Sequence, residues 1–192
     1  MIKYVYIFEL NKDYESMIDE IVDASGHVER SFYHEQGKVY VFDASVVLDT
    51  SLLIQTMMSE TLTNIDAYAS YSLKASELDK HLHTLKTLTN TKKPMVKGVM
   101  TDHDILKAYH GTYHPKLKPF ILKKYANQHV MEASVIMYLN HNQNMSVAAK
   151  ELYVHRNTLI TRLEKFHEVT GFDMKTFYDA YLMYDLLHQK GH

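Results

Sequence analysis

The chain of 192 residues has no cysteine, three prolines and six glycines. Without cysteine, disulfides, thiolate zinc sites and cysteine chemistry of every kind are excluded. No run of about 18 apolar residues is present to cross a membrane. The amino-terminal stretch MIKYVYIFEL lacks the basic start and the small-residue cleavage site of a signal peptide. We therefore expect a cytoplasmic protein that does not associate with a membrane.

The residues that are present are typical of an ordered globular protein. Hydrophobic residues make up 46% of the chain and charged residues 23%, and the length suits one large domain or two small ones. The formal net charge of -2 is unevenly spread, because residues 1–110 carry 11 Lys and Arg against 16 Asp and Glu, whereas residues 111–192 carry 10 against 7. An acidic first part and a mildly basic second part favour two units, of which the second better tolerates a polyanion.

The first hundred residues alternate between period-two and period-3.6 patterns of apolar residues. The patterns predict, in chain order, a strand over residues 3–8, a helix over 13–22 that ends before Gly26, a hairpin over 30–44, a helix capped by Asp49 or Thr50, a strand over 65–73, a helix over 77–88 and a short strand over 96–100. This order resembles a ferredoxin-like sandwich, in which helices cover one face of a sheet. We expect such an α+β domain over residues 1–110.

The rest of the chain has only helical patterns. The stretch HGTYHPKLKP holds two prolines and a glycine, so we place a linker at residues 111–119 and a second domain at 120–192. Helices are predicted over residues 120–126, 130–140, 147–152, 155–169 and 176–188. Ser146 is the predicted N-cap of the third of these helices, and Gly171 is the predicted C-terminal cap of the fourth.

A short helix, a tight turn and a longer helix within about twenty residues have the spacing of a helix-turn-helix. Ala148 and Ala149 are small enough to let the two helices approach each other closely. Leu159, Leu163 and Phe166 recur at spacings of four and three, so we expect these three side chains in the core.

The opposite side of the longer helix is then free to enter a DNA groove. At about 100° per residue, Asn157, Thr161 and Glu164 point away from Leu159. The residues that we expect to contact bases are Arg156, Asn157 and Thr161. The residues that we expect to contact phosphates are Ser146, Thr158, Arg162 and Lys165. The alternative interpretation of the same residues is a solvated helix face.

The stretch SVAAKELYVHRNTLITRLEKFHEVTGFDM resembles the carboxy-terminal helix-turn-helix of PucR/CdaR-type transcriptional regulators. The resemblance covers about residues 128–188 and is carried by small residues before a Leu, an HRNTL segment, an Arg-Leu pair, and Thr-Gly followed by an apolar residue and Asp. It implies a transcriptional regulator that binds double-stranded DNA in the major groove. Two positions depart from the pattern, because such regulators commonly carry Arg or another polar residue at the position of Ile160 and basic residues near Glu164.

The resemblance also has an implication for the first domain, since such regulators often carry a degenerate GGDEF-like domain, a ferredoxin-like fold related to nucleotide cyclases. The turn HEQG stands where an active cyclase holds its GGDEF motif. It contains one acidic residue, Glu35, so a two-metal phosphoryl-transfer site cannot be built from the turn alone. We therefore expect a non-catalytic domain, no enzyme activity and no cofactor.

The expected partners are a second copy of the chain and an effector, either a small molecule or a protein. A homodimer is expected because paired recognition helices about one DNA turn apart give an affinity for DNA that a single small DNA-binding domain seldom reaches. The alternative function is a helix-turn-helix that no longer binds DNA and serves protein assembly, as Ile160 and Glu164 would permit. A third, enzymatic interpretation has only the cyclase-like order of elements in its favour.

The remaining histidines, acidic residues and aromatic residues have simpler interpretations. His81 and His83 lie two apart on a helix, where the rings diverge, and His110 and His114 flank a glycine turn, so we expect no metal site. The segment 102–104, Asp-His-Asp, is interpreted as a polar turn. An aromatic run with helical spacing is interpreted as core or as a dimer surface and consists of Phe177, Tyr178, Tyr181 and Tyr184.

Overall fold

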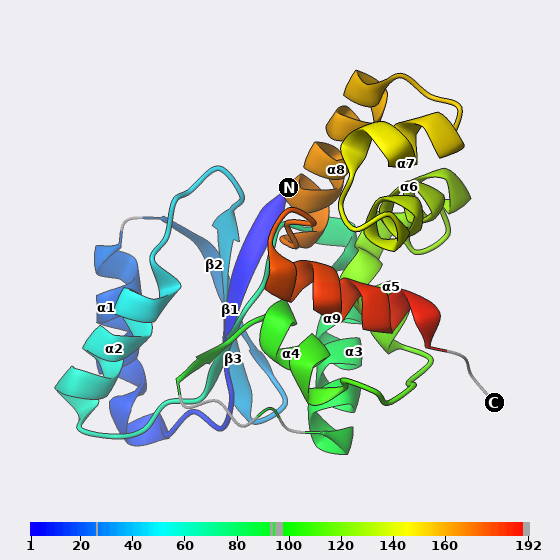
Figure 1. The fold of residues 1–192 in the computed structure, drawn as a ribbon. Helices are drawn as coiled ribbons and strands as arrows, with labels where there is room; N and C mark the ends of the chain where they lie inside the picture. Colours follow the sequence, from blue (N-terminus) through cyan, green and yellow to red (C-terminus); the bar gives the residue numbers. More distant parts are fainter. Residues whose placement is uncertain (26, 93, 95–97, 190–192) are drawn as a thin grey trace. The chain divides into compact units, whose positions relative to one another are not determined.

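The computed structural model describes residues 1–25, 27–92, 94 and 98–189, and the contacts within the chain divide it into two units. The amino-terminal unit consists of Met1–Asp79 and Pro94–Asp104, and the helical unit consists of Lys80–Lys93 and Ile105–His192. The predicted mixed α+β composition is confirmed (Figure 1). The units describe which residues pack together, so the domain boundary predicted at residues 111–119 stays a prediction.

A five-stranded sheet with the order β2-β3-β1-β4-β5 forms the centre of the amino-terminal unit. Its strands are β1 Ile2–Ile7, β2 Val28–His34, β3 Gly37–Asp43, β4 Ala67–Ala69 and β5 Val99–Met100. β1 pairs antiparallel with β3 and β4, β3 pairs antiparallel with β2, and β4 pairs parallel with β5. Because β3 separates β1 from β2, the helix between β1 and β2 crosses over one strand.

The helical segments of this unit are η1 Lys12–Tyr14, α1 Glu15–Ala24, α2 Thr50–Thr61 and η2 Ala75–Glu77. α1 and α2 pack side by side (Figure 1). Their apolar side chains, among them Ile18, Val22 and Met57, are buried with those of the strands in one core. Six of the seven residues of β3 are buried.

Most sequence predictions for this unit are confirmed with shifted ends. The hairpin forms with Glu35 and Gln36 at its turn, and the Asp49 side chain accepts a hydrogen bond from Leu52 N at 2.9 Å, as expected for a cap. The strand predicted over residues 65–73 is shorter, because only Ala67–Ala69 form regular pairs. The strand predicted over residues 96–100 is described at Val99–Met100, and residues 95–97 lie outside the described chain.

Segment 102–104, interpreted above as a polar turn, instead begins helix α4, Asp102–Ala108. That interpretation was wrong, because the Asp104 carboxylate accepts hydrogen bonds from Thr101 N at 2.8 Å and Thr101 Oγ1 at 2.9 Å and so supports a helix start. Asp102 is buried and accepts a hydrogen bond from the Tyr68 hydroxyl. The burial of Tyr68 raises its pKa, and the Asp102 charge raises it further.

Gly37, at the start of β3, is where the sheet has no room for a side chain. A Cβ added there would overlap the Ile7 carbonyl oxygen and lie 2.5 Å from Tyr6 Cε2. The glycine predicted as part of the hairpin turn is therefore required by the close approach of β1.

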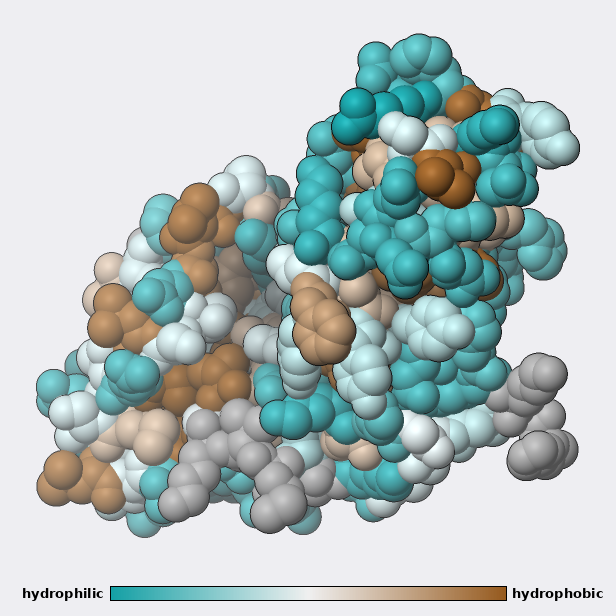
Figure 2. Space-filling view, in the orientation of Figure 1, coloured by the Kyte–Doolittle hydropathy of each residue, from teal (hydrophilic) through white to brown (hydrophobic). Residues whose placement is uncertain are grey.

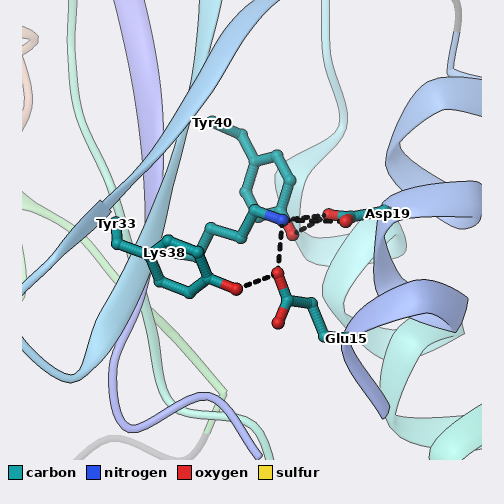
Figure 3. A network of polar contacts seen from close by, with 5 residues as sticks. All are labelled: Glu15, Asp19, Tyr33, Lys38 and Tyr40. Carbon is teal, nitrogen blue, oxygen red and sulfur yellow. Dashed lines mark hydrogen bonds and ion pairs between the residues drawn. The ribbon is translucent and has the colours of Figure 1, made fainter. Parts of the chain in front are cut away.

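A network of charged and phenolic side chains joins α1 to β2 and β3 (Figure 3). The ammonium of Lys38, which is 6% exposed, lies 2.8 Å from Glu15 Oε1 and 2.8 Å from both carboxylate oxygens of Asp19. Tyr33 donates to Glu15, and Tyr40 donates to Asp19 Oδ1 at 2.7 Å. The hydrophobic pattern gave no signal for this network, because its members are brought together only by packing.

The electrostatics of the network favour fixed charges. Hydrogen bonds from Lys38 and Tyr33 hold the pKa of Glu15 below its ordinary value. Burial lowers the pKa of Lys38, but the hydrogen bonds with Asp19 and Glu15 outweigh burial and raise it. Burial and the hydrogen bond to Asp19 raise the pKa of Tyr40. The Lys38 ammonium and the Glu15 carboxylate thus keep their charges near neutral pH, which suits a structural link better than proton transfer.

The helical unit is built from the larger part of α3 together with five further helices that follow α4. Their bounds are α3 Leu78–Thr91, α5 Leu117–Leu122, α6 His129–Asn140, α7 Met145–Glu151, α8 Arg156–Thr170 and α9 Phe177–His188, with the single turn η3 at Lys123–Tyr125. Four of the helices predicted after residue 119 are found with ends shifted by one or two residues. The helix predicted over residues 120–126 instead begins at Leu117, inside the predicted linker, and ends at Leu122, where η3 follows it. No helix within the described residues is long and apolar enough to cross a membrane.

The buried face of α3 explains why its residues belong to the helical unit. Leu82, Leu85 and Leu88 are completely buried, and Tyr109 donates a hydrogen bond to Leu88 O at 2.8 Å. The His81 ring stacks on Phe120 with 4.3 Å between ring centroids, so His81 packs in this core. Across the described residues, no group of three or more His, Asp or Glu side chains is placed to hold a metal ion.

Candidate nucleic-acid interface

The helix-turn-helix consists of α7, residues 152–155 and α8, and α6 packs against both helices. α7 begins at Met145, and the Asn144 side chain accepts a hydrogen bond from Val147 N at 3.2 Å. The prediction of Ser146 as the N-cap was therefore wrong. Asn144 has the extended backbone of a cap, whereas Ser146 is an exposed residue in the first turn of α7.

Both ends of α8 are closed by caps. His155 precedes the helix in an extended conformation, and its Nδ1 accepts a hydrogen bond from Asn157 N at 3.2 Å. Gly171 follows the helix with a φ of 83°, and its N–H donates to His167 O at 2.8 Å, which confirms the predicted C-terminal cap. The His155 cap fixes where the first turn of α8 begins, and residues 156–158 of that turn are exposed.

The inward face of α8 is apolar, as predicted. Leu159, Leu163 and Phe166 are 0%, 4% and 1% exposed. Phe166 stacks on Tyr125 of η3 with 5.9 Å between ring centroids. Ala148 of α7 is completely buried, as expected for a small side chain on a helix that packs against α8. The core therefore fixes the rotation of α8 about its own axis.

The opposite face of α8 carries exposed polar side chains. Five of the predicted contact residues on α8 are exposed and make no side-chain hydrogen bond or ion pair to any described residue: Arg156, Asn157, Thr158, Thr161 and Lys165. Ser146 on α7 is exposed as well. Asn157 and Thr161 lie opposite the buried Leu159, whereas Arg156 stands at the start of the helix, and the polar groups of all five are available to a partner.

Arg162 is placed differently from the other predicted residues. It is half-buried, and its Nη1 donates a hydrogen bond to Ser134 Oγ on α6 at 3.0 Å. Ser134 is completely buried and donates its own proton to Val130 O at 2.7 Å. Sequence reasoning missed Ser134, although a small polar residue directly before the buried Val135 was a signal for an internal partner.

The outward face changes its charge along α8. Glu164 and Glu168 are both exposed and continue the row of Asn157 and Thr161 at spacings of three and four residues. Glu168 was not among the predicted contacts, although the same 100° increments place it opposite Leu159. The row that starts with the neutral side chains of Asn157 and Thr161 therefore ends in two carboxylates, with Lys165 beside them. Ile160 is half-buried beside this row.

Comparison with known proteins places this arrangement in a family. Residues 133–185 match the family described as the PucR C-terminal helix-turn-helix domain. This part of the chain is a PucR-type helix-turn-helix domain. The resemblance to PucR/CdaR-type regulators is thereby confirmed over α6 to α9, while a GGDEF-like domain before it stays a prediction.

The PucR-type domain also relates the chain to longer proteins. The chain is 35% identical over 63 residues to the carbohydrate diacid regulator of Escherichia coli, and these residues are 33% of this chain and 16% of that protein. It is 30% identical over 107 residues to the purine catabolism regulatory protein of Bacillus subtilis, and these residues are 56% of this chain and 19% of that protein. The chain thus spans less than a fifth of the length of either relative.

Among solved structures, the chain is similar to a regulator of polyketide synthase expression from Bifidobacterium adolescentis. The match has a TM-score of 0.44 and 15% sequence identity, and it covers 94% of this chain and 76% of the other.

Proposed function

We propose that the protein is a transcriptional regulator that binds double-stranded DNA by placing the start of α8 in the major groove. The observation that carries the proposal is the exposed row of polar side chains on a capped, rigidly packed helix of a PucR-type domain. The names of the two regulators to which this domain is similar support the same function. A polar helix face without internal partners is also compatible with simple solvation, so the proposal depends on a binding test.

Within the proposed complex, the residues divide by what they can reach. Bases are assigned to Arg156, Asn157 and Thr161, because the first turns of a recognition helix lie deepest in the groove. Phosphates are assigned to Ser146, Thr158, Arg162 and Lys165. A guanidinium has five N–H donors, so the bond from Arg162 to Ser134 holds the side chain in place and leaves donors for a phosphate oxygen.

The acidic end of α8 has a role in the same proposal. Carboxylates at Glu164 and Glu168 repel phosphates, so they favour a docking in which only the first half of the helix enters the groove. A carboxylate near bases can still accept a hydrogen bond from a cytosine amino group. The half-buried Ile160 is placed to contact a thymine methyl group.

For the remainder of the chain, the proposal keeps a ferredoxin-like, GGDEF-like domain at residues 1–110, a linker at 111–119 and the DNA-binding domain at 120–192. The strand order β2-β3-β1-β4, with antiparallel neighbours throughout, supports the ferredoxin-like assignment. Two acidic residues of α1 are engaged by Lys38, which supports a non-catalytic role without a cofactor. The proposed regulator acts in the cytoplasm as a homodimer and responds to a small-molecule or protein effector.

A second candidate function is protein assembly by a helix-turn-helix that does not bind DNA. The two exposed carboxylates, Glu164 and Glu168, favour it, because they oppose a polyanion along half of the outward face. The two functions differ in their dependence on salt, since contacts with phosphates release counterions and contacts with proteins generally release few.

The deciding experiment selects genomic duplexes that bind the full chain and then titrates their affinity against salt by fluorescence anisotropy. We expect log K to fall linearly with log salt, and Lys165→Ala to reduce the slope by about 0.9. The double variant Arg156→Ala/Asn157→Ala is expected to weaken binding by roughly 100-fold or more, because each base contact contributes about 1–3 kcal/mol.

The matched control is Arg30→Ala, which removes an exposed arginine from β2 of the amino-terminal unit. It should leave both the affinity and its salt dependence unchanged. If the wild-type chain selects no duplex, or if the double variant binds as tightly as the wild type, the assembly function replaces the DNA-binding one.

A further inference from the structure

Helix α9 exposes a row of aromatic rings that its own unit does not cover. Phe177 is 81% exposed, and Tyr181 and Tyr184 are 46% and 45% exposed. Together with His188 they recur at spacings of four, three and four residues, so they lie along one side of the helix. We name these four residues the α9 stripe. In Figure 2 the surface over α9 is pale to light brown, whereas the surface over α7 and α8 is mostly teal.

The rings of the α9 stripe are held in a fixed order by one another. The ring centroids of Phe177 and Tyr181 lie 6.2 Å apart, with an angle of 13° between the ring planes. The ring centroids of Tyr184 and His188 lie 4.0 Å apart, with an angle of 25°. Tyr181 also stacks on His110 at 5.0 Å and shares a hydrogen bond with its Nε2. Rings that are already ordered lose little side-chain entropy when a partner covers them.

The α9 stripe forms a ridge between two open grooves. One groove of about 510 Å³ is lined by residues 110–113 and by the second half of α9. The other, of about 490 Å³, is lined by the end of α6, by residues that follow it and by the first half of α9. Tyr181 and Tyr184 belong to both grooves. A ridge flanked by grooves lets two copies interdigitate, because the ridge of one copy can enter the groove of another.

The charges on α9 do not oppose such pairing. Asp179 accepts a hydrogen bond from Asp173 N at 2.7 Å. Asp185 accepts from Gly111 N at 3.0 Å and from Gln189 Nε2 at 2.8 Å. Because both carboxylates are turned to donors of their own unit, two copies can meet without bringing unpaired carboxylates face to face.

The exposed area has the size of the centre of an interface. An aromatic side chain has about 150–250 Å² to bury, so the three aromatic residues of the stripe present roughly 350 Å² at their exposed fractions. A stable interface buries about 800 Å² on each partner, with tyrosine and phenylalanine enriched in its centre. The stripe supplies a little under half of that area.

From these observations we infer that the α9 stripe is the surface on which a second copy of this chain docks, with the ridge of each copy in a groove of the other. Such contacts are related by a two-fold axis, so both copies use the same residues. The inference rests on the proposed homodimer and goes beyond it by assigning the surface. It also keeps the dimer contact on α9, a helix that carries none of the residues proposed to contact DNA.

The test measures the oligomeric state of the full chain by sedimentation equilibrium. The wild type is expected to be a dimer at micromolar concentration, and Phe177→Ser/Tyr184→Ser to raise the dissociation constant of the dimer by roughly 100-fold or more, as the loss of two central aromatic contacts predicts. The matched control is Tyr153→Ser, which removes a tyrosine that is 96% exposed elsewhere in the same unit. It should leave the dimer intact. Far-ultraviolet circular dichroism of each variant verifies that the helices remain folded.

A second measurement uses the absence of cysteine from the chain. Single cysteines introduced as Phe177→Cys, Tyr181→Cys and Tyr184→Cys sample the stripe, and the one nearest the two-fold axis should form an intermolecular disulfide, because two Cα atoms must lie within about 7 Å. Tyr153→Cys is the control and should remain reduced under the same mild oxidation.

The outcomes separate this inference from the proposed function. A wild-type chain that is monomeric at about 100 µM, or a stripe variant that dimerises as tightly as the wild type, would falsify the inference, and so would capture of a different protein on the stripe of a monomeric chain. A dimer that depends on the stripe but selects no DNA would leave the inference standing and remove the proposed function.

Discussion

The two units treat their polar side chains in opposite ways. In the amino-terminal unit, Lys38 is buried, and its ammonium is enclosed by Glu15 and Asp19 from a neighbouring helix. In the helical unit, Arg156 and Asn157 stand at the start of a rigid helix without side-chain partners in the described part of the chain. A polar group that is satisfied internally stabilises the fold, whereas an exposed group on a rigid element is available for recognition. The comparison therefore favours a structural role for the first unit and a binding role for the second.

The backbone differs between the units in a similar way. β1 and β3 approach so closely that only a glycine fits at position 37. In the turn of the helix-turn-helix, by contrast, Tyr153 has a φ of 53° and is 96% exposed, so space is ample and only the conformation is unfavourable. The first unit is thus limited by packing, and the turn of the second by backbone strain. Three substitutions test these contrasts.

The largest effect is expected from Gly37→Ala. The new methyl group would overlap the Ile7 carbonyl oxygen and press on the Tyr6 ring, so β1 and β3 must separate. We expect a loss of roughly 3 kcal/mol or more in the free energy of unfolding of the amino-terminal unit, at the upper end of the cost of overpacking. Urea unfolding followed by tyrosine fluorescence measures this loss.

The control for this substitution is Gly98→Ala in the same unit. Gly98 has a φ of 84°, and no described residue lies within 4 Å of an added Cβ, so the left-handed conformation is what opposes the change, at about 1–2 kcal/mol. If both variants lose the same stability, close packing at β3 is not what distinguishes Gly37.

The second substitution, Lys38→Met, keeps the apolar stem and removes the charge. Glu15 and Asp19 then face each other without the ammonium that holds them, so the midpoint of thermal unfolding should fall, though less than in Gly37→Ala. Lys12→Met is the matched control, since Lys12 is exposed and contributes only a minor Coulombic part to the lowered pKa of Glu15. It should change the midpoint little.

The pH dependence of Lys38→Met follows from the direction of the pKa shift. The pKa of Glu15 is lowered in the folded protein, so its contribution to stability is fully present above the ordinary pKa of a glutamate and is lost as pH falls through the lowered folded value. The difference in stability between wild type and variant should therefore be largest near neutral pH and shrink in that acidic window. A difference that is constant with pH would show that lost packing, and not lost charge, destabilises the variant.

Sequence patterns predicted what depends on regular spacing. The buried row Leu159, Leu163 and Phe166 follows from the helical period, and the caps Asp49 and Gly171 follow from local backbone chemistry. The N-cap of α7 was misplaced by two residues because Asn144 and Ser146 are both good caps, and only the backbone conformation decides between them. The exposed face of α8 was predicted as a set of residues, and its binding role stays a prediction.

Contacts between distant segments could not be predicted from those patterns. Lys38 meets Asp19 across 19 residues of sequence, and Arg162 meets Ser134 across 28. Neither pair produces a periodic pattern in the sequence. The first depends on how a helix packs on a strand, and the second on how two helices pack together. The burial of Asp102 could not be predicted for the same reason, since its partner Tyr68 lies on a strand 34 residues earlier.

The smallest effect, and the only stabilising one, is expected from Tyr153→Gly. A residue with a Cβ pays about 1–2 kcal/mol for the left-handed conformation, while glycine adopts it freely but loses about 0.5–1 kcal/mol of chain entropy on folding. The free energy of unfolding of the helical unit should thus rise by roughly 0.5–1 kcal/mol. Tyr153→Ala removes the same ring and keeps the strain, so it should not stabilise the unit. Should alanine stabilise as much as glycine, exposure of the ring, and not the backbone conformation, would be the cost at this turn.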